Sequence, residues 1–114
     1  MSSRGEQAEA LALRYLESKG LKLIAQNYRC RYGEIDLIMR DGKTTVFTEV
    51  RLRKSNAFGG ALASVDGNKQ RRILTAARHY LSEQRGAPPC RCDVLLMSDI
   101  SEQSIEWIQN AFTE

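Results

Sequence analysis

Four charged side chains stand in two short runs that are otherwise largely apolar, and their types suit metal or phosphate chemistry. Glu34 and Asp36 lie in the run GEIDLIM, while Glu49 and Arg51 lie in the run VFTEVRL. Carboxylate oxygens bind Mg²⁺, which keeps several water ligands and often takes only one or two protein carboxylates. An arginine beside such acids can neutralise them or bind a phosphate through two parallel hydrogen bonds. The residue types therefore favour a site that holds a cation, a phosphate or both.

The sequence between these runs predicts how they meet. Asp41-Gly42 is a strong signal for a two-residue hairpin loop, so we expect a strand on either side of it. Counting outward from this loop places Glu34 opposite Glu49. It also makes Asp36 a diagonal neighbour of Glu49, with backbones roughly 7–8 Å apart. Because side chains alternate between faces, these acids and Arg51 share one face of the hairpin. The opposite, apolar face is expected to carry Ile35, Leu37, Met39, Val46, Val50 and Leu52.

Two interpretations of the charged face remain open. Like charges directly opposite each other destabilise a strand pair, so Glu34 and Glu49 need a cation between them. That cation is either a metal ion held by the acids or an arginine. In the second case, Arg51 and other basic residues simply pair with the acids on a solvated face.

The runs on either side predict the elements that position this hairpin. Apolar residues at helical spacing predict a helix over residues 6–18, and Lys19-Gly20 is a suitable stop. A second helical stripe covers residues 69–84, with Asn68 as the expected N-cap. Residues 54–68 predict a loop or a short helix near the site. The expected order is helix 6–18, strand 21–30, two hairpin strands, helix 69–84, strand 90–98 and a strand or strand-like tail at 104–112. This order predicts a layered α/β domain with a mixed sheet.

Length and composition favour one ordinary globular domain over residues 1–114. Hydrophobic residues make up 42% of the chain and charged residues 27%. No apolar run approaches the roughly 20 residues that cross a bilayer, and no secretory signal is visible at the N-terminus. The odd number of cysteines, three, argues against a disulfide framework and favours a reducing compartment. We therefore expect a cytoplasmic protein without a membrane partner.

Positive charge is concentrated in one part of the chain. Residues 51–85 contain eight basic and two acidic residues, a net charge of +6, although the whole chain carries only +3. A basic region beside acids is typical of proteins that hold phosphates near a metal ion. The alternative is a solvated helix face.

Several motifs together resemble a known family. They are GEQAEALALRYL at residues 5–16, NYRCRYGEIDLIMRDGKTTVFTEVRLR at 27–53, FGGA at 58–61, NKQRRI at 68–73 and RCDVLL at 91–96. The chain is similar to the uncharacterised YraN-type family, within the branch of the PD-(D/E)XK, or restriction-endonuclease-like, superfamily that looks like archaeal Holliday-junction resolvases. The superfamily motif places an acid on one strand and an acid, any residue and a lysine on the next.

The resemblance implies a three-layer α/β domain, in which helices flank a central mixed sheet with a restriction-endonuclease-like core. It implies Mg²⁺- or Mn²⁺-dependent cleavage of phosphodiesters. Asp36 and Glu49 match the metal-binding acids, and Glu6 matches a glutamate on the first helix that completes the site. Arg51 stands where the superfamily usually has lysine. Gln70 matches more loosely a glutamine that some of these nucleases keep on the helix after the sheet.

The arginine in place of lysine changes what the site can do. Lysine can orient or deprotonate an attacking water, whereas arginine does not give up its proton in a protein. Arg51 can still bind the scissile phosphate and stabilise developing charge. We expect the nucleic-acid backbone to be bound by Arg53, Lys54, Lys69, Gln70, Arg71 and Arg72.

These features lead to two expected functions. The first is a metal-dependent endonuclease that acts on branched or otherwise structured DNA in repair or recombination, where a homodimer would suit a four-way junction. The second is a DNA- or RNA-binding module that keeps the nuclease fold with weakened chemistry. A protein-interaction scaffold without nucleic acid is a third class. Elsewhere, Asp93 is a weak site candidate that could instead pair with an arginine, and Cys92 is expected in the core.

Overall fold

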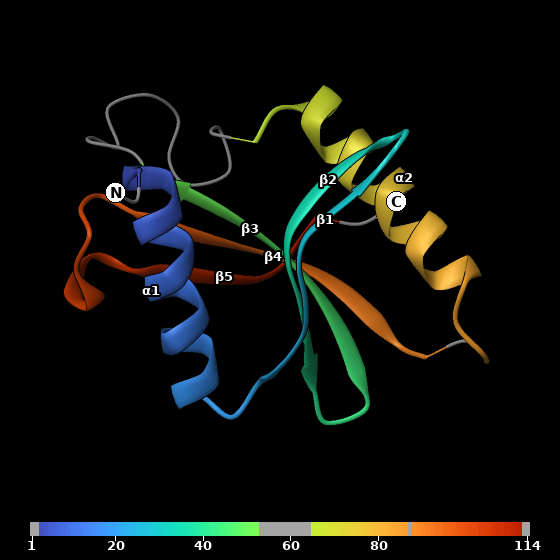
Figure 1. Ribbon diagram of the computed structural model, residues 1–114, viewed down its shortest axis with the longest axis horizontal. Helices are drawn as coiled ribbons and strands as arrows, with labels where there is room; N and C mark the ends of the chain where they lie inside the picture. Colours follow the sequence, from blue (N-terminus) through green and yellow to red (C-terminus); the bar gives the residue numbers. More distant parts are fainter. Residues whose placement is uncertain (1–2, 53–64, 87, 113–114) are drawn as a thin grey trace.

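The computed structural model describes residues 3–52, 65–86 and 88–112, and they form an α/β domain built on one five-stranded sheet (Figure 1). The elements are α1 (Arg4–Ser18), β1 (Lys22–Cys30), β2 (Gly33–Asp41), β3 (Thr44–Leu52), α2 (Gly67–Ser82), β4 (Cys90–Met97), the short 3₁₀ helix η2 (Glu102–Ser104) and β5 (Glu106–Phe112). The strands follow one another in the order β1-β2-β3-β4-β5, and only β3 and β4 run parallel. The predicted order of elements and the mixed sheet are confirmed.

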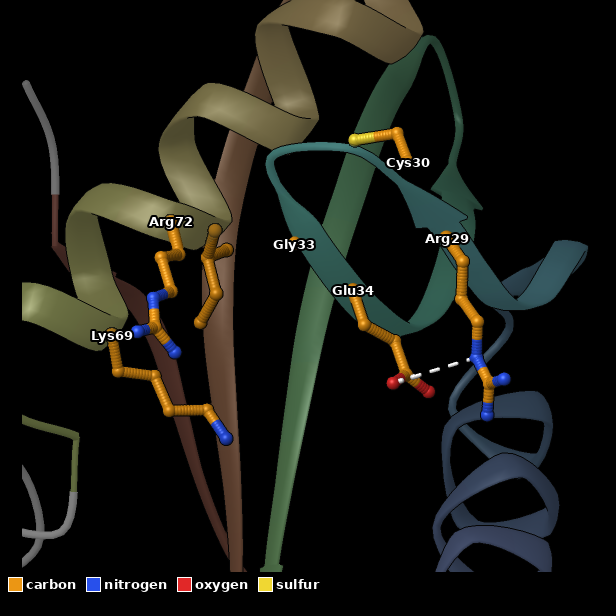
Figure 2. Close-up of a pocket in the computed structure, with 7 residues that line it drawn as sticks. Arg29, Cys30, Gly33, Glu34, Lys69 and Arg72 are labelled. Carbon is orange, nitrogen blue, oxygen red and sulfur yellow. Dashed lines mark ion pairs between the residues drawn. The ribbon is translucent and has the colours of Figure 1, made fainter.

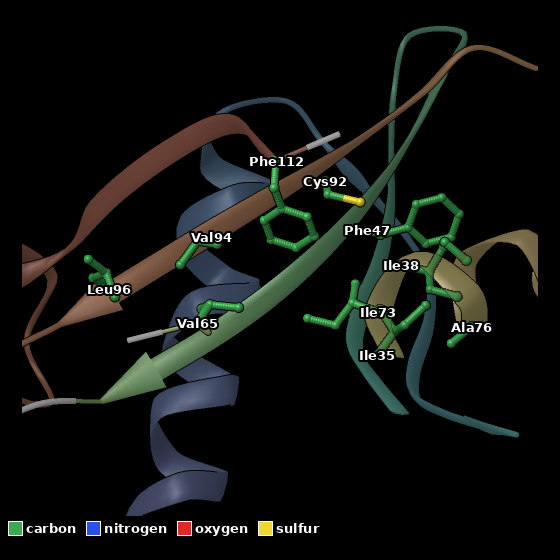
Figure 3. Close-up of a cluster of buried hydrophobic side chains, with 11 residues drawn as sticks. Ile35, Ile38, Phe47, Val65, Ile73, Ala76, Cys92, Val94, Leu96 and Phe112 are labelled. Carbon is green, nitrogen blue, oxygen red and sulfur yellow. The ribbon is translucent and has the colours of Figure 1, made fainter. Parts of the chain in front are cut away.

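The two helices cover opposite faces of the sheet. The side chains of β4 show this directly, because Val94 and Leu96 pack in the core under α2, while Leu95 packs in the core under α1. The core under α2 also contains Phe47 and Cys92, as Figure 3 shows, so the predicted burial of Cys92 is confirmed. Since strand residues alternate between faces, a sheet covered on both sides must bury nearly every residue of its central strands.

Each helix begins at a side chain that satisfies free backbone N–H groups. Ser3 and Glu6 form a reciprocal capping box at the start of α1, with hydrogen bonds of 3.1 and 3.3 Å. At the start of α2, the Asp66 carboxylate accepts a hydrogen bond of 2.9 Å from the Lys69 N–H. Asp66 is therefore the N-cap of α2, and the prediction that Asn68 caps this helix was wrong.

The hairpin of β2 and β3 turns one residue later than the sequence predicts. Asp41 pairs with Thr44, and Gly42 opens the two-residue loop with a φ of 61°. Glycine reaches this conformation without the steric cost of a Cβ, which is why it suits the first loop position. Consequently Ile38 faces Phe47, and the predicted register of the hairpin was wrong.

The predicted division of the hairpin into one charged and one apolar face was also wrong. Ile35 and Ile38 both pack under α2, whereas Leu37 packs under α1. In a regular strand Ile35 and Leu37 would share a face, so the alternation is broken at Asp36. Both faces of the hairpin are buried, and the acids lie where the regular pairing stops.

Part of the predicted basic region lies outside the described residues. Arg53, Lys54 and the expected loop or short helix up to residue 64 belong to this part. Within the described ranges, neither helix is long and apolar enough to span a membrane.

Candidate active site

Asp36 and Glu49 lie opposite each other on β2 and β3, and not diagonally as the sequence predicts. The last regular pair of these strands is Leu37 with Thr48, one residue before the two acids. The N–H of Val50 then donates to Asp36 Oδ2 at 2.9 Å. A side-chain oxygen of Asp36 thus accepts a strand N–H, which fixes the orientation of its carboxylate.

The two carboxyl groups are held in a region that disfavours negative charge. Glu49 is only 4% exposed, and burial together with the nearby Asp36 charge raises the pKa of Glu49 to about 7. Burial also raises the pKa of Asp36, although the Val50 N–H and the charge of Lys69 lower it. Carboxyl groups with raised pKa values in a partly buried position attract a proton or a cation, and such groups concentrate at functional sites.

Two basic side chains approach Glu49 from different elements. Lys69 reaches from the first turn of α2, and its Nζ lies 2.9 Å from Glu49 Oε1. Arg51, two residues further along β3, places Nη1 3.7 Å from the same oxygen. Lys69 therefore makes the closer contact, and a lysine stands next to the acid even though the strand motif itself ends in arginine.

A further pair of acids lies close to Asp36. Glu9 is on α1 and Glu34 is at the start of β2. Burial and then the charges of Asp36 and Glu34 raise the pKa of Glu9. In the amide orientation that satisfies both acids, Asn27 donates to Glu9 Oε1 at 3.0 Å and to Glu34 Oε1 at 3.3 Å. Asn27 has a φ of 51°, so the chain adopts an unusual backbone conformation at this bridging residue.

On the first helix, Glu9 and not the expected Glu6 lies close to the strand acids. Glu6, the expected third metal ligand, is exposed and engaged in the capping box with Ser3. Glu9 lies nearly one turn later, where its charge and that of Asp36 interact. Glu6 was chosen from the family resemblance, and helix periodicity does not distinguish it from Glu9, three residues along on the same face.

A basic pocket of about 470 Å³ lies between α2 and the hairpin of β1 and β2, and Lys69, the partner of Glu49, is one of its lining residues (Figure 2). Lys69 and Arg72 point into it from α2, opposite Glu34 and Arg29, which form an ion pair at 3.6 Å. Three cations and one acid therefore line the pocket, and its charge suits a phosphate. The charge pattern of the sequence did not indicate Arg29, because this residue lies outside the basic segment 51–85.

The remaining predicted residues on α2 have structural partners of their own. Gln70 donates from Nε2 to the Val65 carbonyl at 2.8 Å, which ties the helix to the residue before its N-cap. Arg71 donates to the side chain of Asn68. The structure thus brings Lys69 and Arg72 to the acids and directs Gln70 to the backbone instead.

The expected Mg²⁺ or Mn²⁺ can be tested against this donor set. Among the described residues, no group of three or more acidic, histidine or cysteine side chains is arranged to hold a metal ion. Asp36 and Glu49 fit an ion that takes two carboxylates and completes its coordination with water. Lys69 forms an ion pair with Glu49 Oε1, so the lysine and a metal ion would compete for this oxygen.

Asp93, the weak candidate, belongs to a separate structural network. It is fully buried on β4 and accepts from Arg91 Nε at 3.1 and 3.2 Å. It also accepts from Trp107 Nε1 and from the Asn110 N–H, both at 2.9 Å. The expectation that Asp93 could pair with an arginine is confirmed, and its oxygens are fully used.

Fold and site together define an α/β protein in which a buried and a half-buried carboxyl group lie beside a lysine that lines a basic pocket. The chain belongs to the uncharacterised protein family UPF0102, whose sequence model matches residues 8–97. It is 52% identical over 112 residues to a UPF0102 protein of Nitrosomonas europaea, covering 98% of this chain and 95% of the relative. It is 50% identical over 113 residues to a UPF0102 protein of Methylobacillus flagellatus, covering 99% of each. The expected membership of the YraN-type family is confirmed.

Proposed function

We propose that this protein is a metal-dependent nuclease that cleaves branched or otherwise structured DNA in repair or recombination. The observation that carries the proposal is the carboxyl pair of buried Glu49 and half-buried Asp36, together with Lys69, which contacts Glu49 and lines a basic pocket. The resemblance of the strand motif to the PD-(D/E)XK superfamily supports the same function.

Each residue of the site has a role in this reaction. Mg²⁺ or Mn²⁺, when bound, supplies an activated water and neutralises phosphate oxygens. Asp36 and Glu49 would hold the ion, and the hydrogen bond from the Val50 N–H fixes the orientation of the Asp36 carboxylate. Arg72 faces the pocket from α2 and binds the phosphate backbone there.

Lys69 offers the function that Arg51 cannot. Arginine stabilises negative charge but keeps its proton, so Arg51 contributes electrostatic stabilisation only. Lys69 reaches Glu49 from α2 at 2.9 Å and also lines the basic pocket, so one side chain connects the acid to the place where a phosphate would bind. We assign it to orienting the attacking water or the scissile phosphate, as the motif lysine does in the superfamily.

A nuclease assay with matched amide variants tests the proposal. Purified protein is incubated with labelled four-way junction, flap, duplex and single-stranded DNA, first with Mg²⁺ and then with Mn²⁺. Asp36→Asn and Glu49→Gln remove one charge each with little change in size. We expect each to slow cleavage by about a hundredfold or more while DNA binding persists.

The control for this assay is Glu106→Gln, which removes an acid from the exposed start of β5. We expect it to cleave like the wild type. Cleavage that survives both Asp36→Asn and Glu49→Gln would contradict the proposal.

A binding module with weakened chemistry is the second candidate function. It is favoured by the ion pairs of Glu49 with Lys69 and Arg51, which already supply positive charge to the acid without a metal ion. This function predicts salt-dependent binding of DNA or RNA without cleavage under either metal. Restored cleavage in Arg51→Lys would then show that the arginine is the cause.

A further inference from the structure

A second pocket, of about 420 Å³, lies beside the candidate active site. Its lining residues come from α2 and from the turn between β1 and β2, and they are Tyr32, Asn68, Arg71, Arg72 and Thr75. Arg72 lines both pockets, so the two are neighbours. Unlike the first pocket, this one has no acidic residue among its described lining residues. Its charge therefore suits an anion more strongly.

The tip of the β1–β2 hairpin presents an aromatic ring to this pocket. Tyr32 is 43% exposed, and Leu23 is the other large hydrophobic residue found exposed within the described ranges. The Tyr32 ring meets the His79 ring edge-on at 5.6 Å between centroids. The guanidinium of Arg31 lies 5.4 Å from the Tyr32 ring centroid. An exposed ring among arginines contributes little to the core, and it is the arrangement that stacks on nucleic-acid bases.

The backbone next to Tyr32 is fitted closely to α2. A Cβ on Gly33 would lie 3.3 Å from Arg72 Cβ and 3.4 Å from the Arg72 carbonyl oxygen. A contact of 3.3 Å is tighter than a Cβ normally makes, and the φ of Gly33, 155°, also favours glycine, so the hairpin tip rests directly on the helix. The distance between the Tyr32 ring and the arginines of α2 is therefore set by packing.

The arginines of this pocket are arranged for a phosphate. Arg71 donates one N–H to the Asn68 side chain, which orients its guanidinium group. A guanidinium carries five N–H donors, so others are available to a phosphate. Arg72 stands one residue further along α2 and faces the same pocket.

We propose that this second pocket binds an unpaired nucleotide, with its base stacked on Tyr32 and its phosphate held by Arg71 and Arg72. The inference rests on the proposed function for its nucleic-acid partner, and it names the feature of the substrate that the site recognises. Because Arg72 lines both pockets, a single-stranded segment bound in the second pocket would continue into the first, which Lys69 also lines. A flap or an opened junction arm supplies such a segment, whereas a blunt duplex does not.

Binding in the absence of metal tests this inference separately from cleavage. Fluorescence anisotropy in EDTA compares a single-stranded oligonucleotide with one of equal length and charge that contains abasic positions. In Tyr32→Ala we expect affinity for the normal strand to fall about tenfold, because one stacked base is lost. Affinity for the abasic strand, which offers no base to stack, stays unchanged.

Two further variants separate stacking from folding and from general surface effects. Tyr32→Phe keeps the ring and is expected to bind both strands like the wild type. Leu23→Ala removes the other exposed apolar side chain, from β1, and is expected to have no effect on either strand. Thermal unfolding of each variant reports whether the fold is intact.

Three results would overturn the inference. They are an equal loss on both strands in Tyr32→Ala, unchanged affinity of that variant for the normal strand, and absence of strand binding by the wild type. None of these results depends on Asp36 or Glu49. If the protein binds unpaired bases but does not cleave DNA, the proposed nuclease activity is wrong and the stacking pocket stands. If it cleaves DNA without a contribution from Tyr32, the stacking pocket is wrong and the nuclease activity stands.

Discussion

Two buried acids on neighbouring strands of this fold differ in how their negative charge is compensated. Asp93 on β4 and Glu49 on β3 occupy adjacent positions of the parallel pair, since Asp93 pairs with Thr48 and Glu49 with Val94. The two acids are 0% and 4% exposed. Their burial is therefore nearly equal, and the difference between them lies in their partners.

Asp93 is compensated by its own sheet, whereas Glu49 is not. Asp93 accepts from the Arg91 side chain, the Trp107 indole and the Asn110 backbone. Glu49 has a second carboxyl group, that of Asp36, as its neighbour and relies on Lys69 of α2 for its close ion pair. A buried charge is costly unless it is paired and hydrogen-bonded. An acid kept under-compensated is thus better explained by function than by stability.

Removing each acid should show how differently the two are compensated, and the largest effect is expected at Asp93. Asp93→Ala leaves Arg91 and Trp107 without their buried partner, and we expect a loss of about 3–5 kcal/mol in the free energy of unfolding. Glu49→Ala relieves the repulsion with Asp36 and releases only Lys69, which is partly exposed to water, so it should cost far less. Urea unfolding at neutral pH measures both. Equal losses in the two variants would contradict the distinction.

The free energy of unfolding should depend on pH through the titration of Glu49. Its pKa is raised from 4.5 to about 7 on folding, so between these values the folded state binds more protons than the unfolded state. Stability therefore falls as pH rises through this window. Glu49→Gln lacks this titration, and relative to the wild type it should gain about 1–3 kcal/mol from pH 4.5 to 7.

Urea unfolding across this pH range measures the effect. Glu106→Gln, an exposed acid on β5, serves as the matched control and should follow the wild-type profile. A wild-type profile that runs parallel to that of Glu49→Gln would mean that Glu49 keeps an ordinary pKa in the fold.

The sequence was sufficient to place the helices and strands along the chain, but it was not sufficient to predict the strand register and the contacts between these elements. Helix stripes and strand runs are local, so the periodicity of α1 and α2 and the turn signal near Asp41 placed them well. The hairpin register depends on which two residues form the loop. Asp41-Gly42 was the predicted loop, but the loop begins at Gly42, so every predicted pair of β2 and β3 was out of register. At the break in alternation the Asp36 side chain accepts a hydrogen bond from the Val50 backbone, a contact that no periodicity reveals.

The same limit applies to the site. Asp36, Glu49 and Lys69 were all singled out from the sequence, yet their contact depends on how α2 packs on β3. Glu9 was missed because a helix face shows which residues point inward and not which strand residue they meet. Tyr32 was missed because one exposed aromatic residue has no periodic signal, and its meaning comes from the arginines of α2 beside it.

The smallest expected effect concerns how much of the Glu49 compensation comes from Lys69. Lys69→Gln removes the nearest positive charge, and since that charge lowers the pKa of Glu49, the pKa should move further upward. Arg71→Gln removes an equal charge two residues along α2, where the partner is Asn68, and is the matched control.

The pH dependence of the free energy of unfolding gives the midpoint of the Glu49 titration in each variant. We expect the midpoint to rise in Lys69→Gln only, with a stability cost above neutral pH of about 1 kcal/mol or less, because Lys69 is partly exposed to water. A similar shift in both variants would mean that Glu49 responds to the general positive charge of α2. The contrast with Asp93, whose compensation is built from specific hydrogen bonds, would then be one of charge density and not of individual partners.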